Sequence, residues 1–232
     1  MTKFYNSVWA ILLISLMTAC QQGEKQSFVA DTEAKKIAKA YGFEHFDRVE
    51  TISYTFNVDV GERHVERSWN WNTDTNEITY NGPIEGDSVV TYSYERDSLD
   101  VADTRMKTVD QRFINDKYWL LFPFNLVWDT DMQITETGKA TAPIDSTEKY
   151  KLTVQYGQKG GYTPGDAYDL YYEKDDYMVD EWVFRKGGSN ENPSPFTWED
   201  HQEKGPMLIP MDHYGPDKNF RLYFTGVSVT TK

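Results

Sequence analysis

Strict alternation of apolar and polar residues recurs along this 232-residue chain, and it limits the fold more than any other feature. Ile52, Tyr54, Phe56 and Val58 fall on one side of such a stretch, and residues 150–156 repeat the pattern. Because successive side chains of a β-strand point to opposite faces, each stretch predicts a strand with one apolar and one solvated face. Glycine, proline and asparagine separate the stretches, which favours antiparallel neighbours. We therefore expect about ten antiparallel strands.

The last alternating stretch contains an irregularity at a glycine. Along residues 219–231 the apolar positions change parity after Gly226. One extra residue in a strand produces such a change, and glycine often occupies the extra position. The sequence therefore predicts a β-bulge at Gly226.

Helical spacing replaces the alternation in two segments. Residues 28–41 carry apolar side chains every three or four positions, which predicts one amphipathic helix that stops at Gly42. Residues 104–122 show the same spacing and predict a helix or a helix pair. We expect it to end at Pro123, because proline lacks a backbone donor and clashes with the preceding turn.

An antiparallel sheet with one apolar face has to cover that face. We predict a mostly β protein of the α+β class, with a large curved antiparallel sheet or unclosed half-barrel. The N-terminal helix and the helical insertion would cover its concave face. Residues 118–129, YWLLFPFNLVWD, are too short and too interrupted to span a bilayer, so we expect them to lie over the apolar face.

The N-terminus has the layout of a secretory signal peptide. Residues 1–19 join a lysine to an apolar stretch and a small pair, Thr18-Ala19, directly before Cys20. Cys20 is the only cysteine, so we predict that it carries the lipid of an envelope lipoprotein. The alternative is an ordinary signal peptide with an incidental cysteine near its cleavage site.

The resulting division of the chain is simple. We expect residues 1–19 to be removed, residues 20–27 to form a lipidated tether and residues 28–232 to form one domain. Residues 1–19 contain one lysine and no acid, so their removal would change the formal charge from −13 to −14. Such a field repels nucleic acid and anionic headgroups, which leaves the acyl chains on Cys20 as the contact with the membrane.

Several of these residues also carry a resemblance to a known family. The stretch INDKYWLLFPFNLVWD, the strand YKLTVQY, the run from Gly161 to Tyr172 and YMVDEWVFR resemble an uncharacterised family of Gram-negative envelope lipoproteins. That family is similar to the lipoprotein-carrier superfamily, the LolA/LolB-like fold, and the resemblance covers residues 30–230. It implies an unclosed antiparallel barrel that holds acyl chains on its concave side, in a lipoprotein of the cell envelope, most often the outer membrane.

The abundant aromatic residues have two interpretations. They line a cavity for a lipid or another apolar ligand, or they fill a β core, where aromatic residues are favoured in any case. Trp69, Trp71 and Trp182 separate the lipid interpretation, in which they are shielded, from a surface glycan-binding one, in which they are accessible. A scaffold without any ligand is the remaining alternative. The candidate cavity residues are Tyr54, Phe56, Trp69, Trp71, Trp119, Phe122, Phe124, Leu152, Val154, Leu170, Trp182, Phe184, Leu222 and Phe224.

Catalytic and metal-binding motifs are missing from the sequence. It contains no GxSxG, HExxH, P-loop or GxGxxG pattern, so we expect neither an enzyme nor a cofactor. Asp200-His201 and Asp212-His213 are acid–imidazole neighbours in the sequence, but neighbours on a strand point to opposite faces, so we do not expect either pair to act together. His64 and Glu66 share a face but lack a third ligand, so we expect no metal site.

Overall fold

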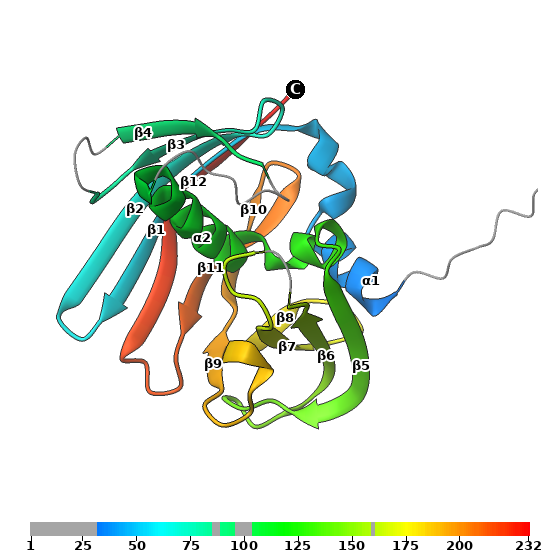
Figure 1. Cartoon of the computed structure of the whole chain (residues 1–232). Coiled ribbons are helices and arrows are strands. Elements are labelled where there is room, and N and C mark those ends of the chain that lie inside the picture. The colour runs from blue at the N-terminus through cyan, green and yellow to red at the C-terminus, as the bar shows by residue number, and fades with distance from the viewer. Residues whose placement is uncertain (1–31, 85–88, 96–103, 159–160) are drawn as a thin grey trace, which may run out of the picture. The chain divides into compact units, whose positions relative to one another are not determined.

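Antiparallel strands dominate the computed structural model, which describes residues 32–84, 89–95, 104–158 and 161–232 (Figure 1). The predicted signal peptide, Cys20 and the tether 20–27 lie outside the described residues. The helical segments are α1 (Glu33–Ala40), η1 (Phe43–Arg48), α2 (Thr104–Trp128) and η2 (Lys186–Gly188). One sheet contains β1 (Val49–Val60), β2 (Arg63–Asn72), β3 (Glu77–Asn81), β4 (Val89–Ser93), β10 (Glu199–Lys204), β11 (Met207–Tyr214) and β12 (Phe220–Thr231). The other contains β5 (Met132–Thr141), β6 (Glu148–Tyr156), β7 (Ala167–Tyr172), β8 (Val179–Arg185) and β9 (Ser194–Thr197).

The mostly β, unclosed architecture with two covering helices is confirmed, but the strands form two sheets instead of one. The seven-stranded sheet has the order β10-β11-β12-β1-β2-β3-β4, and the five-stranded sheet has the order β5-β6-β7-β8-β9. Only Trp198 separates β9 from β10, so the chain passes from one sheet to the other within a few residues. The change occurs at Trp198, because Thr197 still pairs with Glu181 of β8 whereas Glu199 already pairs with Asp212 of β11.

Alternation identified the buried faces correctly. Ile52, Tyr54 and Phe56 of β1 are buried, as are Leu152 and Val154 of β6. All of them belong to one hydrophobic core that draws on both sheets and both α-helices. The described residues form one compact unit around this core.

The predicted bulge at Gly226 is confirmed. Ser53 of β1 pairs with Ser228, whereas Thr55 pairs with Thr225, so β12 contains one residue more than its partner at this point. Gly226 has a φ of 60°, a left-handed conformation that glycine adopts without the clash of a Cβ atom.

The helix α1 is held against both sheets by its last turn. Thr32 caps its start by accepting a hydrogen bond from the Lys35 amide at 3.3 Å. At its end the Tyr41 hydroxyl accepts from the Val179 amide of β8 at 3.0 Å and lies 2.9 Å from Nε2 of His201 on β10. Gly42 ends the helix as predicted, because its φ of 91° is left-handed, and glycine is required there since a Cβ would collide with the carbonyl oxygen of Pro206.

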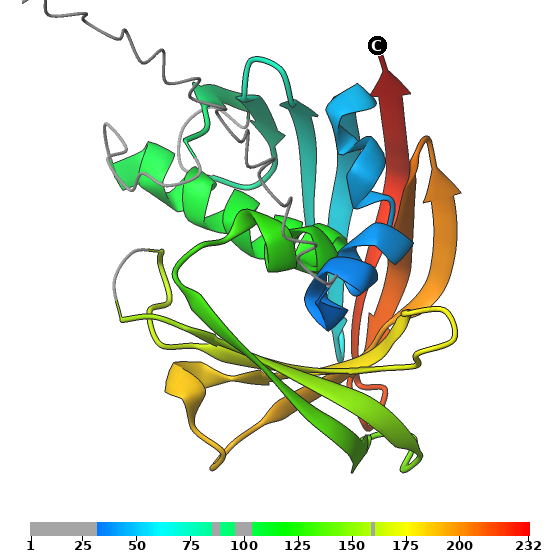
Figure 2. The ribbon, with the colours of Figure 1, turned by 90° about the vertical axis from the view of Figure 1, so that its right-hand side faces the viewer.

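The predicted end of α2 at Pro123 is wrong. The helix continues to Trp128 after a kink at Leu121, whose φ of −132° and ψ of 26° are not helical. Pro123 lies in the first turn after this break, where an amide without a helical partner makes its missing N–H harmless. Figure 2 shows α2 lying between the two sheets beside α1.

Strands β5, β9, β10 and β11 were not predicted. β5 is exposed at most positions, so its sequence lacks the apolar alternation of a half-buried strand. β10 is polar throughout, so it has no apolar positions to alternate. β11 is buried at most positions, so its two faces do not differ enough to alternate.

Within the described ranges, no helix has the length and apolarity needed to cross a bilayer.

Candidate functional site

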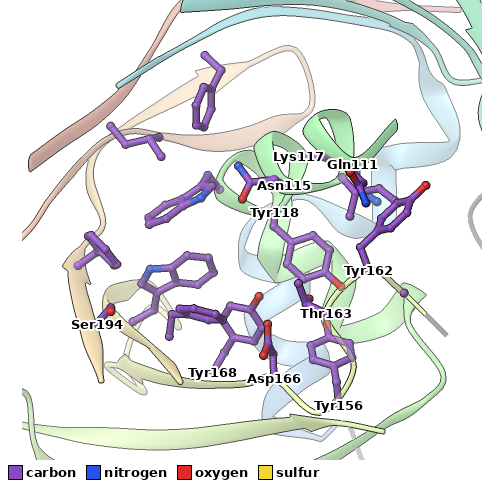
Figure 3. A pocket seen from close by; sticks show the side chains of 18 of the residues that line it. Gln111, Asn115, Lys117, Tyr118, Tyr156, Tyr162, Thr163, Asp166, Tyr168 and Ser194 are labelled. Atoms are coloured by element: carbon purple, nitrogen blue, oxygen red, sulfur yellow. The ribbon is translucent and has the colours of Figure 1, made fainter. Parts of the chain in front are cut away.

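A cavity of about 910 Å³ opens between the two sheets beneath the first part of α2 (Figure 3). Its roof is residues 111–119 of α2. Its walls are the ends of β1, β2 and β12 from one sheet and residues of β7, β8 and β9 from the other. The remaining side consists of residues 129–131, between α2 and β5, and of described residues around the turn that connects β6 to β7. The cavity therefore lies between the two sheets where, among the described residues, α2 is the helix that covers the space.

One side of the cavity is apolar. Its wall includes Val58, Val65, Phe184, Phe196, Phe220 and Leu222. Trp119 contacts the ring of Trp182 at 4.6 Å and the ring of Phe196 at 4.9 Å, both edge to face. These side chains give an apolar ligand an aromatic and aliphatic surface to pack against.

The other side carries phenol and carboxylate groups. Tyr118 and Tyr156 both donate to Oδ2 of Asp129, at 2.8 and 2.7 Å. Burial raises the pKa of each of these two phenols, and the Asp129 charge raises it further. Both hydroxyls therefore stay protonated at neutral pH and hold Asp129 as hydrogen-bond donors.

A second pair of phenols converges on Asp110. Tyr162, in the connection between β6 and β7, donates to Oδ2 of Asp110 at 2.6 Å, and Tyr92 of β4 donates to Oδ1 at 2.9 Å. Burial is the largest cause that raises the pKa of both tyrosines. Asp110 thus joins α2 to the first sheet on one side and to the cavity rim on the other.

An ion pair lies where the cavity meets the core. Arg67 of β2 donates from Nε and Nη2 to the two oxygens of Asp116, at 2.8 and 2.6 Å. Trp69 donates to the same carboxylate at 2.9 Å, and Asp116 is fully buried. Although Arg67 lines the cavity, its charge is already neutralised by this bidentate contact.

The candidate residues from the sequence fall into two groups. Phe56, Trp119, Trp182, Phe184 and Leu222 line the cavity. The others pack in the core and do not line it: Tyr54, Trp69, Trp71, Phe122, Phe124, Leu152, Val154, Leu170 and Phe224. Alternation along a strand identifies the inward face, but the position along that face depends on where α1 and the end of α2 fill the space.

Sequence reasoning missed the polar side of the cavity. Tyr118, Asp129 and Asp166 were not among the candidates. The hydrogen-bond partners of their side chains are 11 or more residues away in the sequence, so no local pattern indicates the contacts. Val58 and Tyr156 carried a usable signal, because each extends a predicted apolar face toward the end of its strand. Following those faces to the strand ends would have found the rim.

His64, His201 and His213 have structural partners. His213 is fully buried with Nδ1 3.0 Å from the carbonyl oxygen of Thr197, while its neighbour Asp212 pairs with Arg221. His64 contacts Asp59 at 2.6 Å and lies 3.8 Å from Glu66. In the part of the chain that the structure describes, no three histidine, cysteine or acidic side chains are placed to hold a metal ion.

Comparisons with known proteins find distant structural likeness. No family model and no curated protein matches the chain. A DUF1329 family protein from Desulfovibrio piger has a TM-score of 0.45 and 8% identity, over 84% of this chain and 91% of that one. A domain described as an outer membrane lipoprotein-sorting protein, from Vibrio parahaemolyticus, has a TM-score of 0.41 and 10% identity, over 85% and 94%. At such scores the likeness assigns no family.

Proposed function

We propose that the protein binds a lipid or another amphiphile and shelters its acyl chain in the cavity between the two sheets. The observation that carries this proposal is the open volume of about 910 Å³ with one apolar side. It lies within the range of about 300–1,000 Å³ that is typical of small-molecule sites. A chain filled by its own side chains would have no such space.

Burial of the acyl chain would supply the affinity. Each methylene group that moves from water to the apolar wall contributes about 0.8 kcal/mol. The walls belong to paired strands and to a helix that the Arg67–Asp116 pair fixes on β2, so little order has to be gained on binding. The phenols and carboxylates of the opposite side would remain close to the polar head group.

The predicted N-terminus gives this binding a location. If residues 1–19 are removed and Cys20 is acylated, the binding domain is tethered to an envelope membrane without a spanning segment. The short tether would keep the cavity near a membrane surface that contains amphiphiles. This part of the proposal predicts that Cys20→Ser releases the protein into the soluble periplasmic fraction.

A blocked cavity tests the proposal directly. Val58→Trp adds an indole at the cavity wall, whereas Val89→Trp makes the same change on β4, where Val89 is 53% exposed. Binding of a fluorescent fatty-acyl probe should fall at least about tenfold in the first variant and remain unchanged in the second. Native mass spectrometry of gently purified protein should show a bound lipid in the parent and in Val89→Trp only.

Equal binding in both variants would show that the probe does not bind in the cavity. A parent protein that carries no lipid and takes up no probe would contradict the proposed function. Circular dichroism of both variants has to match the parent, so that lost binding reports the cavity and not the fold.

The glycan-binding alternative has less support. Trp69, Trp71 and Trp182 are 3%, 2% and 1% exposed, so none of them offers its face to a sugar ring. The scaffold alternative requires a filled interior, which does not fit the cavity. Acrylamide quenching of tryptophan fluorescence gives an independent measurement, and these buried indoles should be quenched weakly.

A further inference from the structure

Three tyrosine rings meet in one part of the cavity. The ring centroids of Tyr118, Tyr156 and Tyr168 lie 5.9–6.2 Å apart, and the rings of Tyr156 and Tyr168 are nearly perpendicular at 88°. All three line the cavity, and Figure 3 shows them around the same space as Asp166. We call these three residues the tyrosine corner; they line the cavity with aromatic surface, to which a cation such as a quaternary ammonium group is attracted.

Carboxylates surround this corner. Asp129 accepts the hydroxyls of Tyr118 and Tyr156, and Asp131 and Asp166 also line the cavity. The backbone brings them together, because the Tyr156 amide donates to the Asp166 carbonyl and the Gly157 amide donates to the Asp131 carbonyl, both at 2.9 Å. Asp166 and Asp129 both act on the Tyr168 hydroxyl, adding to the rise in its pKa that burial causes.

The positively charged side chains of the lining contact groups other than the three carboxylates or lie on a different element. Arg67 is neutralised by Asp116, and Lys117 donates to the hydroxyl of Tyr94 at 3.2 Å. Arg63, the third lining cation, is exposed at the start of β2, on a different element from the three carboxylates. A carboxylate or phosphate head group at the tyrosine corner would therefore meet negative charge, whereas a cation would be stabilised.

We propose that the cavity selects amphiphiles with a cationic head group, with the ammonium at the corner of Tyr118, Tyr156 and Tyr168 and the acyl chain along the apolar wall. The inference rests on the proposed function, because it names the class of ligand for the same cavity. It also gives the phenol and carboxylate side a role that sheltering an acyl chain does not require.

Three probes with the same chain separate this inference from the proposed function. Dodecyltrimethylammonium and dodecanoate are titrated by calorimetry below their micelle concentrations and dodecanol below its solubility limit, at physiological ionic strength to screen the overall charge. The cationic probe should bind about tenfold or more tightly than dodecanoate, with dodecanol between them. The double variant Asp129→Asn/Asp131→Asn should lose most of this preference and keep its affinity for dodecanol.

The control is Glu50→Gln, which removes one exposed charge that does not line the cavity. It should leave the preference unchanged, so that a local effect is distinguished from the net charge of the chain.

Binding of dodecanoate as tight as that of the ammonium probe would overturn the inference while the proposed function stands. A tighter dodecanoate complex that Arg63→Gln weakens would move the head group to the β1–β2 hairpin and overturn it as well. If none of the three probes binds, the proposed function fails, and the inference fails with it.

Discussion

The two parts of α2, before and after its kink, border different interiors: one is open and the other is filled by side chains. Beyond the kink at Leu121, Phe122 and Phe124 are completely buried, and Phe124 contacts the rings of Phe46 and Trp128 at 5.7 and 5.3 Å. We call residues 122–128 with α1 and η1 the packed region. Before the kink, residues 111–119 cover open space, and we call them, with the cavity walls, the hollow region.

Composition does not distinguish these two regions, because both are rich in aromatic residues. The difference lies in how many elements enter the space between the sheets. In the packed region α1 and α2 contact each other and fill it, whereas in the hollow region all the helical residues among the described lining belong to α2. A binding site can therefore arise within a continuous β core from the path of one kinked helix.

The largest expected difference between the regions is in stability. Phe124→Ala should lower the free energy of unfolding by about 3–5 kcal/mol, because it leaves a void among buried rings. Phe184→Ala, on the wall of the hollow region, should cost about 1 kcal/mol, because its side chain already borders open space. Urea denaturation of both variants measures the contrast, and equal losses would mean that the two regions are packed alike.

Acid should act on the core through His213. Burial lowers the pKa of His213 to about 3, below its value of about 6.5 in an unfolded chain. As pH falls below 6.5 the unfolded state binds this proton first, so the contribution is complete above that value and is lost toward pH 3. Between pH 7 and pH 4 the loss should be about 3 kcal/mol.

Between pH 7 and pH 4 the variant His213→Phe should lose about 3 kcal/mol less of its free energy of unfolding than the parent does. The exposed His45→Phe serves as the control and should behave as the parent does. Urea denaturation at both pH values provides the comparison. Parallel acid losses in parent and His213→Phe would show that His213 does not stay neutral in the folded protein.

The ion pair at the boundary of the two regions should show an intermediate cost. Asp116→Ala leaves Arg67 without its partner, and removal of one member of a fully buried pair costs about 3–5 kcal/mol. Arg67 borders the cavity, where water can solvate it, so we expect about 2 kcal/mol. Asp212→Ala breaks the surface pair with Arg221 and should cost less than about 1 kcal/mol. Equal effects of the two variants in urea denaturation would place Arg67 at the surface.

Much of this fold was predictable because local rules decide it. The faces of β1 and β6, the bulge at Gly226 and the stop at Gly42 all follow from strand parity or from the conformational freedom of glycine. The end of α2 was not predictable from such a rule, because proline ends a helix when it lies in the helix interior and not when it lies in the first turn. The kink at Leu121 makes Pro123 part of a new first turn.

The candidate site was predictable only in part, for a different physical reason. Phe56 and Phe124 are equally apolar in the sequence, but one lines the cavity and the other lies in the packed region. Their placement depends on which helix covers each position, which is a tertiary property. The contacts of Asp129 with Tyr118 and Tyr156 join separate elements and leave no local pattern either.

Methyl NMR of the complex with dodecanol tests the central claim most directly, because a neutral probe does not depend on the head-group inference. Its chain should give nuclear Overhauser contacts to the methyl groups of Val58, Val65 and Leu222, which line the cavity. Contacts should be missing for Leu152, Val154 and Leu170, which are equally apolar but lie in the core away from it. Contacts to both sets, or to neither, would contradict a hollow region beside a packed one.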